Sequence, residues 1–282
     1  MAELVLTLSC PDRTGIVHAV SAYLHEAGCN VLDAQQFGDR TTRTFFMRVH
    51  VETDRGRPDL GAGFRAVAGE FGMDWDLYDL AVPPRALIMV SKAGHCLNDL
   101  LYRISAEQLS IDVPLVIGNH PDLAPLTTAH GIDFEHIPVG DTPAAKQAAE
   151  GQILDVVMAE DIDFVILARY MRILSPELCV KLAGRVINIH HSFLPSFKGA
   201  RPYHQAHAHG VKLIGATAHY VTADLDEGPI IEQEVVRVDH TSGPEDLAAI
   251  GRDAERIALA RAVRWHAEHR VLLHGRRTVI FK

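Results

Sequence analysis

The sequence has few cysteines, no excess of positive charge and no long hydrophobic run. The four cysteines form no Cys-x-x-Cys pair, which argues against a zinc finger and favours free thiols in a reducing compartment. They are Cys10, Cys29, Cys96 and Cys179. The chain has 27 lysines and arginines against 36 aspartates and glutamates, so it lacks the basic surface that binds nucleic acid. No apolar run approaches a membrane span, and the first residues lack the basic flank of a signal peptide. We expect a cytoplasmic protein with no nucleic-acid or membrane partner.

What the sequence does contain is enough apolar material for two folded domains. Hydrophobic residues make up 48% of the 282 residues and charged residues 22%, which is typical of a globular protein. At about 150 residues per domain, this length indicates two domains. The Pro83-Pro84 pair cannot continue a central strand, so we place the boundary there, with domains at 1–84 and 85–282.

The first domain alternates between strand and helix patterns. Residues typical of strands occupy Glu3 to Ser9, Asn30 to Phe37, Arg43 to Glu52 and Met73 to Val82. Apolar residues at helical spacing occupy Ile16 to Ala27 and Leu60 to Phe71, each followed by a glycine. The order βαββαβ predicts a ferredoxin-like domain.

The second domain begins with short apolar strands that alternate with helices. The predicted strands are Ala86 to Val90, Val113 to Ile117, Phe134 to Pro138, Phe164 to Ala168 and Val186 to Ile189. The predicted helices between them are Cys96 to Ala106, Asp122 to His130, Ala144 to Glu160 and Pro176 to Leu182. Later come strands at Leu213 to Val221 and Ile230 to Val238, a helix from about Pro244 to His269, and a strand at Thr278 to Phe281. This alternation predicts an α/β domain with a mostly parallel, Rossmann-like sheet covered on both faces.

Parallel sheets bind ligands beyond the carboxyl ends of their strands, so the end of the strand Val186 to Ile189 is a candidate site. Asn188 and His190 share one face of this strand, whereas His191 is predicted to point to the opposite face. An amide donor beside a group that changes charge near pH 7 can bind a carbonyl oxygen as it becomes negative. Taken alone, such a pair is more often a turn-capping asparagine and a core histidine.

An acidic loop from Thr222 to Pro229 is the second candidate. Loops of this kind are usually only solvated. If Asp226 faces His190, however, it can orient the imidazole, stabilise its protonated form and position a water. Asp224 and Glu227 would then be turn and rim residues.

Metal and phosphate patterns are weaker. His204, His207 and His209 lie close together, but offsets of three and five residues do not share one helix face, so we predict no metal site. The segment Ser91 to His95 follows a strand and opens a helix, where an anion could bind. It fits neither the dinucleotide nor the P-loop spacing.

Four blocks in the second domain have a distinctive order and spacing. They run from Ala168 to Ser175, Asn188 to Pro202, Gly215 to Val221 and Asp224 to Ile231. They resemble the formyltransferase-fold enzymes that act on 10-formyltetrahydrofolate, and the resemblance covers 85–282. It implies a catalytic trio of Asn188, His190 and Asp226. It also implies a folate pocket lined by Met171, Arg172, Ile173, Leu174, Thr222, Ala223, Asp224 and Leu225, with no cofactor required.

The first domain resembles an ACT regulatory domain, since the run from Cys10 to Val17 matches its first turn between strand and helix. Two roles are open for this domain. Asp12, Arg13, Thr14 and Gly15 could place helix-terminal N–H groups at the carboxylate of an effector, with glycine or methionine the family-level expectation. The domain could instead serve only to form a homo-oligomer.

An ACT domain joined to a formyltransferase domain resembles the formyltetrahydrofolate deformylase family. The resemblance implies hydrolysis of 10-formyltetrahydrofolate to formate and tetrahydrofolate, supplying formate for purine synthesis and balancing one-carbon pools. A glycinamide ribonucleotide formyltransferase, the main alternative, carries a Gly-Ser-Asn phosphate loop where this chain has Gly94-His95-Cys96. An inactive amino-acid sensor is disfavoured by the intact trio. A hydrolase admits water where a transferase admits an amine, so His95 and His191 either shape that side of the site or only pack.

Overall fold

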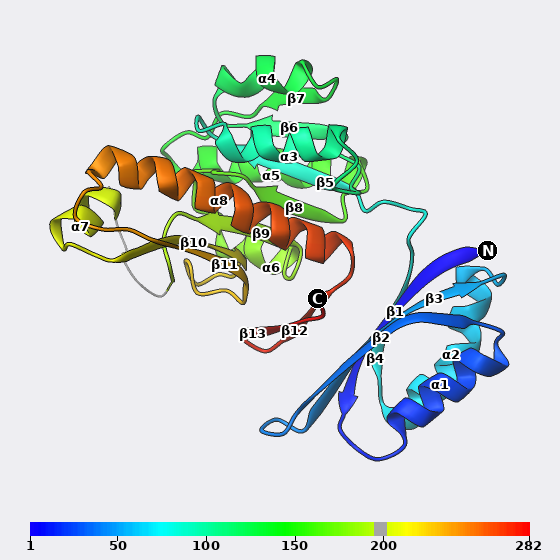
Figure 1. The fold of residues 1–282 in the computed structure, drawn as a ribbon. Coiled ribbons are helices and arrows are strands. Elements are labelled where there is room, and N and C mark those ends of the chain that lie inside the picture. The colour runs from blue at the N-terminus through cyan, green and yellow to red at the C-terminus, as the bar shows by residue number, and fades with distance from the viewer. Residues whose placement is uncertain (195–201) are drawn as a thin grey trace. The chain divides into compact units, whose positions relative to one another are not determined.

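The computed structural model describes residues 1–194 and 202–282 (Figure 1). Contacts divide the chain into two units. The first unit comprises Met1–Pro83 with Glu268–His274 and Thr278–Lys282, and the second comprises Pro84–Ala267 with Gly275–Arg277. The sequence-based division did not include the C-terminal contribution to the first unit. Residues 195–201, which belong to the longest of the four sequence blocks, lie outside the described residues.

The first unit has a four-stranded antiparallel sheet in the order β2-β3-β1-β4, as the βαββαβ pattern predicts. Its strands are β1 (Ala2–Pro11), β2 (Asn30–Asp39), β3 (Thr44–Thr53) and β4 (Asp74–Asp79). Helices α1 (Ile16–Glu26) and α2 (Arg57–Phe71) bury their apolar faces against one side of the sheet. The strand predicted to reach Val82 ends early because the Asp79 carboxylate and carbonyl accept hydrogen bonds from the backbone of residues 81 and 82, forming a turn.

Residues near the C-terminus complete the first unit. Arg48, on β3, is 3% exposed and donates to the carbonyl oxygens of Glu268 and His269 at 3.0 and 3.2 Å. The short strands β12 (Val271–His274) and β13 (Arg277–Ile280) pair in a hairpin. His274, on β12, lies 2.9 Å from the Asp39 carboxylate. Strand β12 was not predicted, because four residues beside a tight turn give little periodicity.

The second unit is built on a seven-stranded sheet in the order β11-β10-β9-β8-β5-β6-β7 (Figure 1). Five strands are parallel: β5 (Ala86–Val90), β6 (Leu115–Gly118), β7 (Asp133–His136), β8 (Phe164–Leu167) and β9 (Val186–His190). The other two, β10 (Leu213–Tyr220) and β11 (Ile230–Arg237), are antiparallel. The predicted class, an α/β protein with an ACT domain and a mostly parallel second domain, is confirmed.

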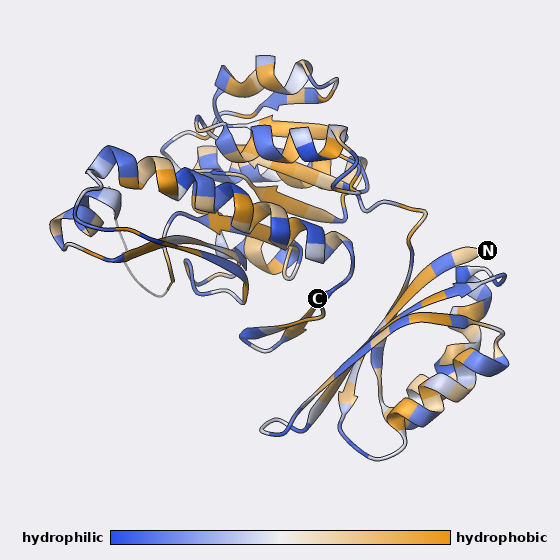
Figure 2. Ribbon diagram, viewed as in Figure 1, coloured by the Kyte–Doolittle hydropathy of each residue, from blue (hydrophilic) through white to orange (hydrophobic). Residues whose placement is uncertain are grey.

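Helices cover both faces of the second sheet. α3 (His95–Ser105) and α8 (Pro244–Ala267) lie on one face, and α5 (Pro143–Ala159) and α6 (Pro176–Lys181) on the other (Figure 1). Figure 2 shows the strands between them as largely hydrophobic, as a sheet buried on both faces requires. No helix in the described ranges is long and apolar enough to span a membrane.

Two short elements differ from the sequence prediction. The helix expected at Asp122 to His130 is a 3-10 turn, η1 (Pro121–Leu123), followed by α4 (Ala124–Thr128). The additional helix α7 (Pro202–Ala208) was not predicted.

Candidate active site

The carboxyl ends of β8 and β9 and the loop after β10 enclose a pocket of about 240 Å³. Its wall includes all three members of the predicted trio and seven of the eight predicted folate-pocket residues. These are Asn188, His190, Asp226, Met171, Arg172, Ile173, Leu174, Thr222, Ala223 and Leu225. Asp224 does not line this pocket: it is exposed, and its carbonyl oxygen accepts from the Thr222 hydroxyl within the turn.

Asp226 and His190 face each other across the pocket floor. Nδ1 of His190 lies 3.3 Å from Oδ1 of Asp226, although the two residues are far apart in sequence. The hydrogen bond from His190 lowers the pKa of Asp226 below its ordinary value, more than burial raises it, so the carboxylate is ionised at neutral pH. Nε2 of His190 is buried and has no hydrogen-bond partner among the described residues. The imidazole is therefore held at Nδ1, while its Nε2 is left without a protein partner in the described part of the chain.

The backbone of the loop brings Asp226 into this position. Asp226 itself adopts a left-handed conformation with φ of 57°, which aspartate tolerates better than most residues. Two residues later, a Cβ atom on Gly228 would overlap the carbonyl oxygen of Tyr220, so only glycine fits there. The amide of Tyr220 donates to the carbonyl of Pro229 at 2.9 Å and closes the loop.

His219 belongs to the same cluster and was not singled out from the sequence. The antiparallel pairing of β9 and β10 sets it opposite Asn188, and its Nε2 lies 3.2 Å from Asn188 Nδ2. Its Nδ1 lies 2.9 Å from the carbonyl oxygen of Tyr220, which can only accept, so Nδ1 carries the hydrogen. Burial lowers the pKa of His219, which keeps the ring neutral. Neutral Nε2 therefore accepts from the amide of Asn188 and orients it.

His191 does not point away from His190 as the strand pattern predicts. Strand β9 ends at His190, the chain bends, and the two rings stack with centroids 4.9 Å apart. Burial, and then the charge of Arg169, lowers the pKa of His191 to about 4. His191 is therefore a neutral group in the pocket wall at pH 7.

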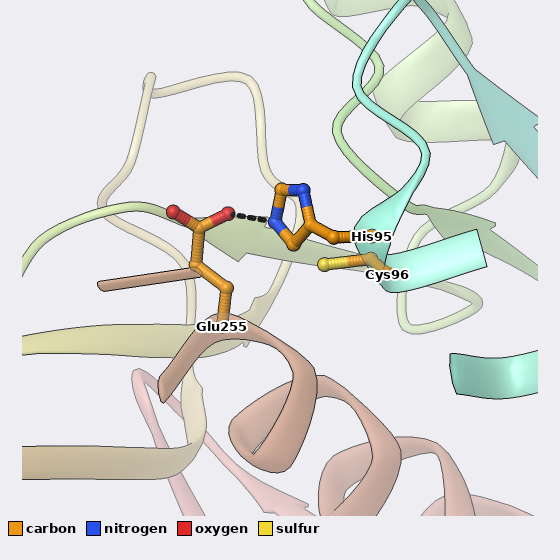
Figure 3. A group of neighbouring side chains, drawn as sticks. All are labelled: His95, Cys96 and Glu255. Atoms are coloured by element: carbon orange, nitrogen blue, oxygen red, sulfur yellow. Dashed lines mark hydrogen bonds and ion pairs between the residues drawn. The ribbon is translucent and has the colours of Figure 1, made fainter. Parts of the chain in front are cut away.

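A second polar cluster lies between α3 and α8. Glu255, on α8, is 1% exposed, and its carboxylate is 2.7 Å from Nε2 of His95 (Figure 3). It also accepts from the hydroxyl of Tyr203 at 3.1 Å and lies 3.4 Å from Nε of Arg169. Although burial raises the pKa of Glu255, the bond from His95 and the charge of Arg169 bring it below its ordinary value. Glu255 is therefore an ionised carboxylate deep inside the unit.

His95, Cys96 and Glu255 also have the residue types of a metal site, with ligand atoms within 4.8 Å of one another (Figure 3). The chemistry of the donors does not favour one. Burial raises the pKa of the Cys96 thiol well above its usual range, and the Glu255 carboxylate already faces a guanidinium. His204, His207 and His209 lie on or just after α7, and all three are exposed. The absence of a metal site stays a prediction.

The turn proposed for an effector lies between β1 and α1. Gly15, with φ of 97°, precedes the first turn of α1, and no side chain caps that helix. Arg13 lies over the ring of Phe71 at 4.3 Å and donates to the carbonyl of Glu70, so this guanidinium is occupied within the unit. Asp12 and Thr14 are exposed.

Both domains of the chain are similar to known proteins. Residues 84–263 match the family described as formyl transferase, and residues 4–61 match the ACT domain. The formyltetrahydrofolate deformylase of Corynebacterium sp. (strain P-1) is 50% identical, over 99% of this chain and 98% of the relative. The chain belongs to the formyltetrahydrofolate deformylase family.

Solved structures support the same assignment. The formyltetrahydrofolate deformylase from Burkholderia mallei ATCC 23344 has a TM-score of 0.95 and 52% identity, with both chains covered completely. Glycinamide ribonucleotide transformylase 1 from Symbiobacterium toebii has a TM-score of 0.67 and 32% identity, over 73% of this chain and 98% of its own. The full-length match is thus with deformylases, and the transformylase matches a smaller share of the chain.

Proposed function

We propose that this chain hydrolyses 10-formyltetrahydrofolate to formate and tetrahydrofolate. The supporting observation is the ionised Asp226 carboxylate 3.3 Å from His190, in a pocket that also holds the oriented amide of Asn188. This arrangement has an acid–base pair and an amide donor at one point, as acyl transfer from an amide requires.

The reaction then follows from these groups. Asp226, directly or through His190, holds a water and accepts its proton as the water oxygen attacks the formyl carbon. Asn188 Nδ2 donates to the carbonyl oxygen as it becomes negative, and His190 Nε2 does so when the ring carries a proton at both nitrogens; the loss of one such donor typically costs about 3 kcal/mol. The proton passes to N10 of the folate, the C–N10 bond breaks, and formate leaves as the anion with release of a proton.

The folate ring system has an apolar surface to bind. Met171, Ile173 and Leu225 line the pocket, yet 58%, 60% and 55% of these side chains are exposed. Large apolar side chains that remain exposed around a pocket indicate a ligand surface. We assign them to the flat face of the pterin, with Asn188 and His190 at the formyl group.

We also propose what the reaction requires, where it takes place and what the ACT domain does. It requires no metal or cofactor, because the attacking group is water and every proton transfer has a partner in the trio. The formate would serve purine synthesis and the balance of one-carbon pools, in the cytoplasm. The ACT domain would form the homo-oligomer or bind an amino acid such as glycine or methionine at residues 12–15.

The test is formate release from 10-formyltetrahydrofolate by the full chain, with no amine acceptor and with EDTA present. Asp226→Asn should lower kcat by about 100-fold or more, because it removes the charge that supports proton transfer. Asp224→Asn is the matched control, since this exposed carboxylate is in the same loop but outside the pocket wall. Turnover that begins only when glycinamide ribonucleotide is added would instead identify a formyltransferase, and inhibition by EDTA would indicate a metal enzyme.

A further inference from the structure

Arg169 is held in a conformation that its backbone disfavours. It follows β8 with φ of 65°, in the left-handed region that non-glycine residues disfavour. Its side chain lines the pocket and is 17% exposed. Its Nε atom is buried and has no hydrogen-bond partner among the described residues. Strain at a pocket residue suggests that the side chain has a function that glycine could not supply.

Glu255 holds Arg169 from behind. The buried carboxylate lies 3.4 Å from Nε of Arg169, and its other partners, His95 and Tyr203, come from α3 and α7. On α8, one turn before Glu255, a Cβ atom on Gly251 would overlap Tyr203, so this helix is shaped to admit that ring. Movement of Arg169 away from Glu255 would weaken the pairing of a buried charge, which is costly. Arg169 is thus a fixed part of the wall.

The two sides of the pocket are supported from opposite faces of the sheet. Tyr170 and Leu174 pack into the apolar cluster shared with α5 and α6, on one face of the sheet. Arg169 reaches instead towards Glu255, on α8, which covers the other face (Figure 1). With the folate against Met171 and Ile173 and its formyl group at His190, as proposed above, Arg169 and His191 are the side chains of the pocket wall left to face the attacking nucleophile.

We infer that Arg169, positioned by Glu255, closes this side of the pocket so that water reaches the formyl carbon and larger amine nucleophiles do not. This inference rests on the proposed hydrolysis. In the normal reaction the water oxygen forms the new bond to carbon, the C–N10 bond breaks and N10 gains a proton. With an amine, nitrogen would form the new bond, N10 would gain the proton lost by the amine, and the product would be a formamide.

Arg169→Gly is the decisive variant. Glycine adopts the left-handed conformation freely, so the substitution removes the side chain and relieves the backbone. Wild-type and variant enzymes are given 10-formyltetrahydrofolate with methoxyamine, a small amine that is unprotonated at neutral pH, and formate and N-formyl methoxyamine are measured by mass spectrometry. Glu107→Gly is the control, because Glu107 is also left-handed, with φ of 56°, but exposed and outside the pocket wall.

We expect only formate from the wild type and from Glu107→Gly. Arg169→Gly should raise the ratio of formamide to formate by at least about 10-fold, comparable to the discrimination that one methylene gives in a shaped pocket. Formate as the only product of Arg169→Gly, or equal trapping by the wild type, would overturn the inference. A wild type that releases no formate without amine would instead contradict the proposed function.

Glu255→Gln tests the positioning role. Glutamine can still accept from Tyr203 and His95 but no longer attracts Arg169, so we expect an increased formamide ratio with an unchanged KM for the folate. If Glu255 has only a structural role, the variant should have a lower melting temperature but the product ratio of the wild type. That result would contradict the inference that Glu255 positions Arg169. The double variant Arg169→Gly with Glu255→Gln leaves no unpaired buried charge, and it should give the same ratio as Arg169→Gly even if that single variant folds poorly.

Discussion

Nε2 of His219 lies 3.2 Å from Nδ2 of Asn188, directly across the pairing of β10 with β9. Because the ring is neutral and its Nδ1 donates to the Tyr220 carbonyl, Nε2 acts as the acceptor that fixes the amide of Asn188. His219→Phe removes this acceptor and should lower kcat by about 10-fold to 100-fold, part of the cost of losing an oxyanion donor. The KM for the folate should not change. His219→Gln supplies another acceptor and should restore part of kcat, and equal kcat in the two variants would show that His219 does not orient Asn188.

Gly228→Ala should lower kcat. Its Cβ would overlap the Tyr220 carbonyl, so the loop that holds Asp226 must move. A displacement of about 1 Å at a catalytic group can cost about 100-fold in rate. Gly151→Ala, on α5 with open space around its Cβ, is the control and should leave kcat unchanged. A Gly228→Ala enzyme with wild-type kcat would contradict the assignment of this loop.

Stability should fall as the pH is lowered from about 6.5 to 4. Burial lowers the pKa of His266 to about 4, and burial together with Arg169 does the same for His191. Between these folded values and the ordinary value near 6.5, the unfolded chain binds the protons and the folded chain does not. Each histidine then contributes a slope of up to about 1.4 kcal/mol per pH unit.

Urea denaturation at pH 7 and pH 5 measures this slope. His266→Gln should make it shallower, since glutamine cannot titrate but still accepts from the Tyr220 hydroxyl, which lies 2.7 Å from His266. An unchanged slope in this variant would show that the pKa of His266 is the same in the folded and the unfolded chain.

Arg48→Met should weaken the first unit. It removes the two hydrogen bonds that this buried guanidinium donates to the carbonyl oxygens of Glu268 and His269, and a hydrogen bond from a charged group typically contributes about 1.5–3 kcal/mol. Denaturant unfolding of the full chain measures the loss. Arg40→Met, at an exposed position after β2, is the control and should change stability by less than about 0.5 kcal/mol. Equal stability of the two variants would mean that residues 268 and 269 do not depend on Arg48.

The sequence predicts the fold class because buried strands and amphipathic helices have local signatures. The apolar run Ala86–Val90 is a strand with the predicted bounds, and the βαββαβ order is confirmed. The predictions are wrong where a turn or a bend interrupts the local pattern of a strand. Strand β4 ends at the turn made by Asp79, and the bend after β9 turns the ring of His191 towards that of His190.

The candidate site was only partly predictable. The blocks of sequence named Asn188, His190 and Asp226, but His219 depends on the register between β9 and β10, which the pattern of a single strand does not encode. The position of Glu255 in the helical pattern could have identified it from the sequence. It follows the buried Ala254 and precedes the buried Ala258 on α8, and a carboxylate on the buried face of a helix requires partners.

The pairing of Arg48 with residues 268 and 269 has a consequence for biosynthesis. A ribosome delivers the chain from its N-terminus, so the strands of the ACT sheet emerge long before the segment that supplies the acceptors for Arg48. Until about 220 further residues have been translated, this guanidinium lacks these two acceptors and depends on Asp33, 3.5 Å away on β2, and on water. The ACT domain is therefore translated first but gains its last contacts only when the C-terminal residues have been translated.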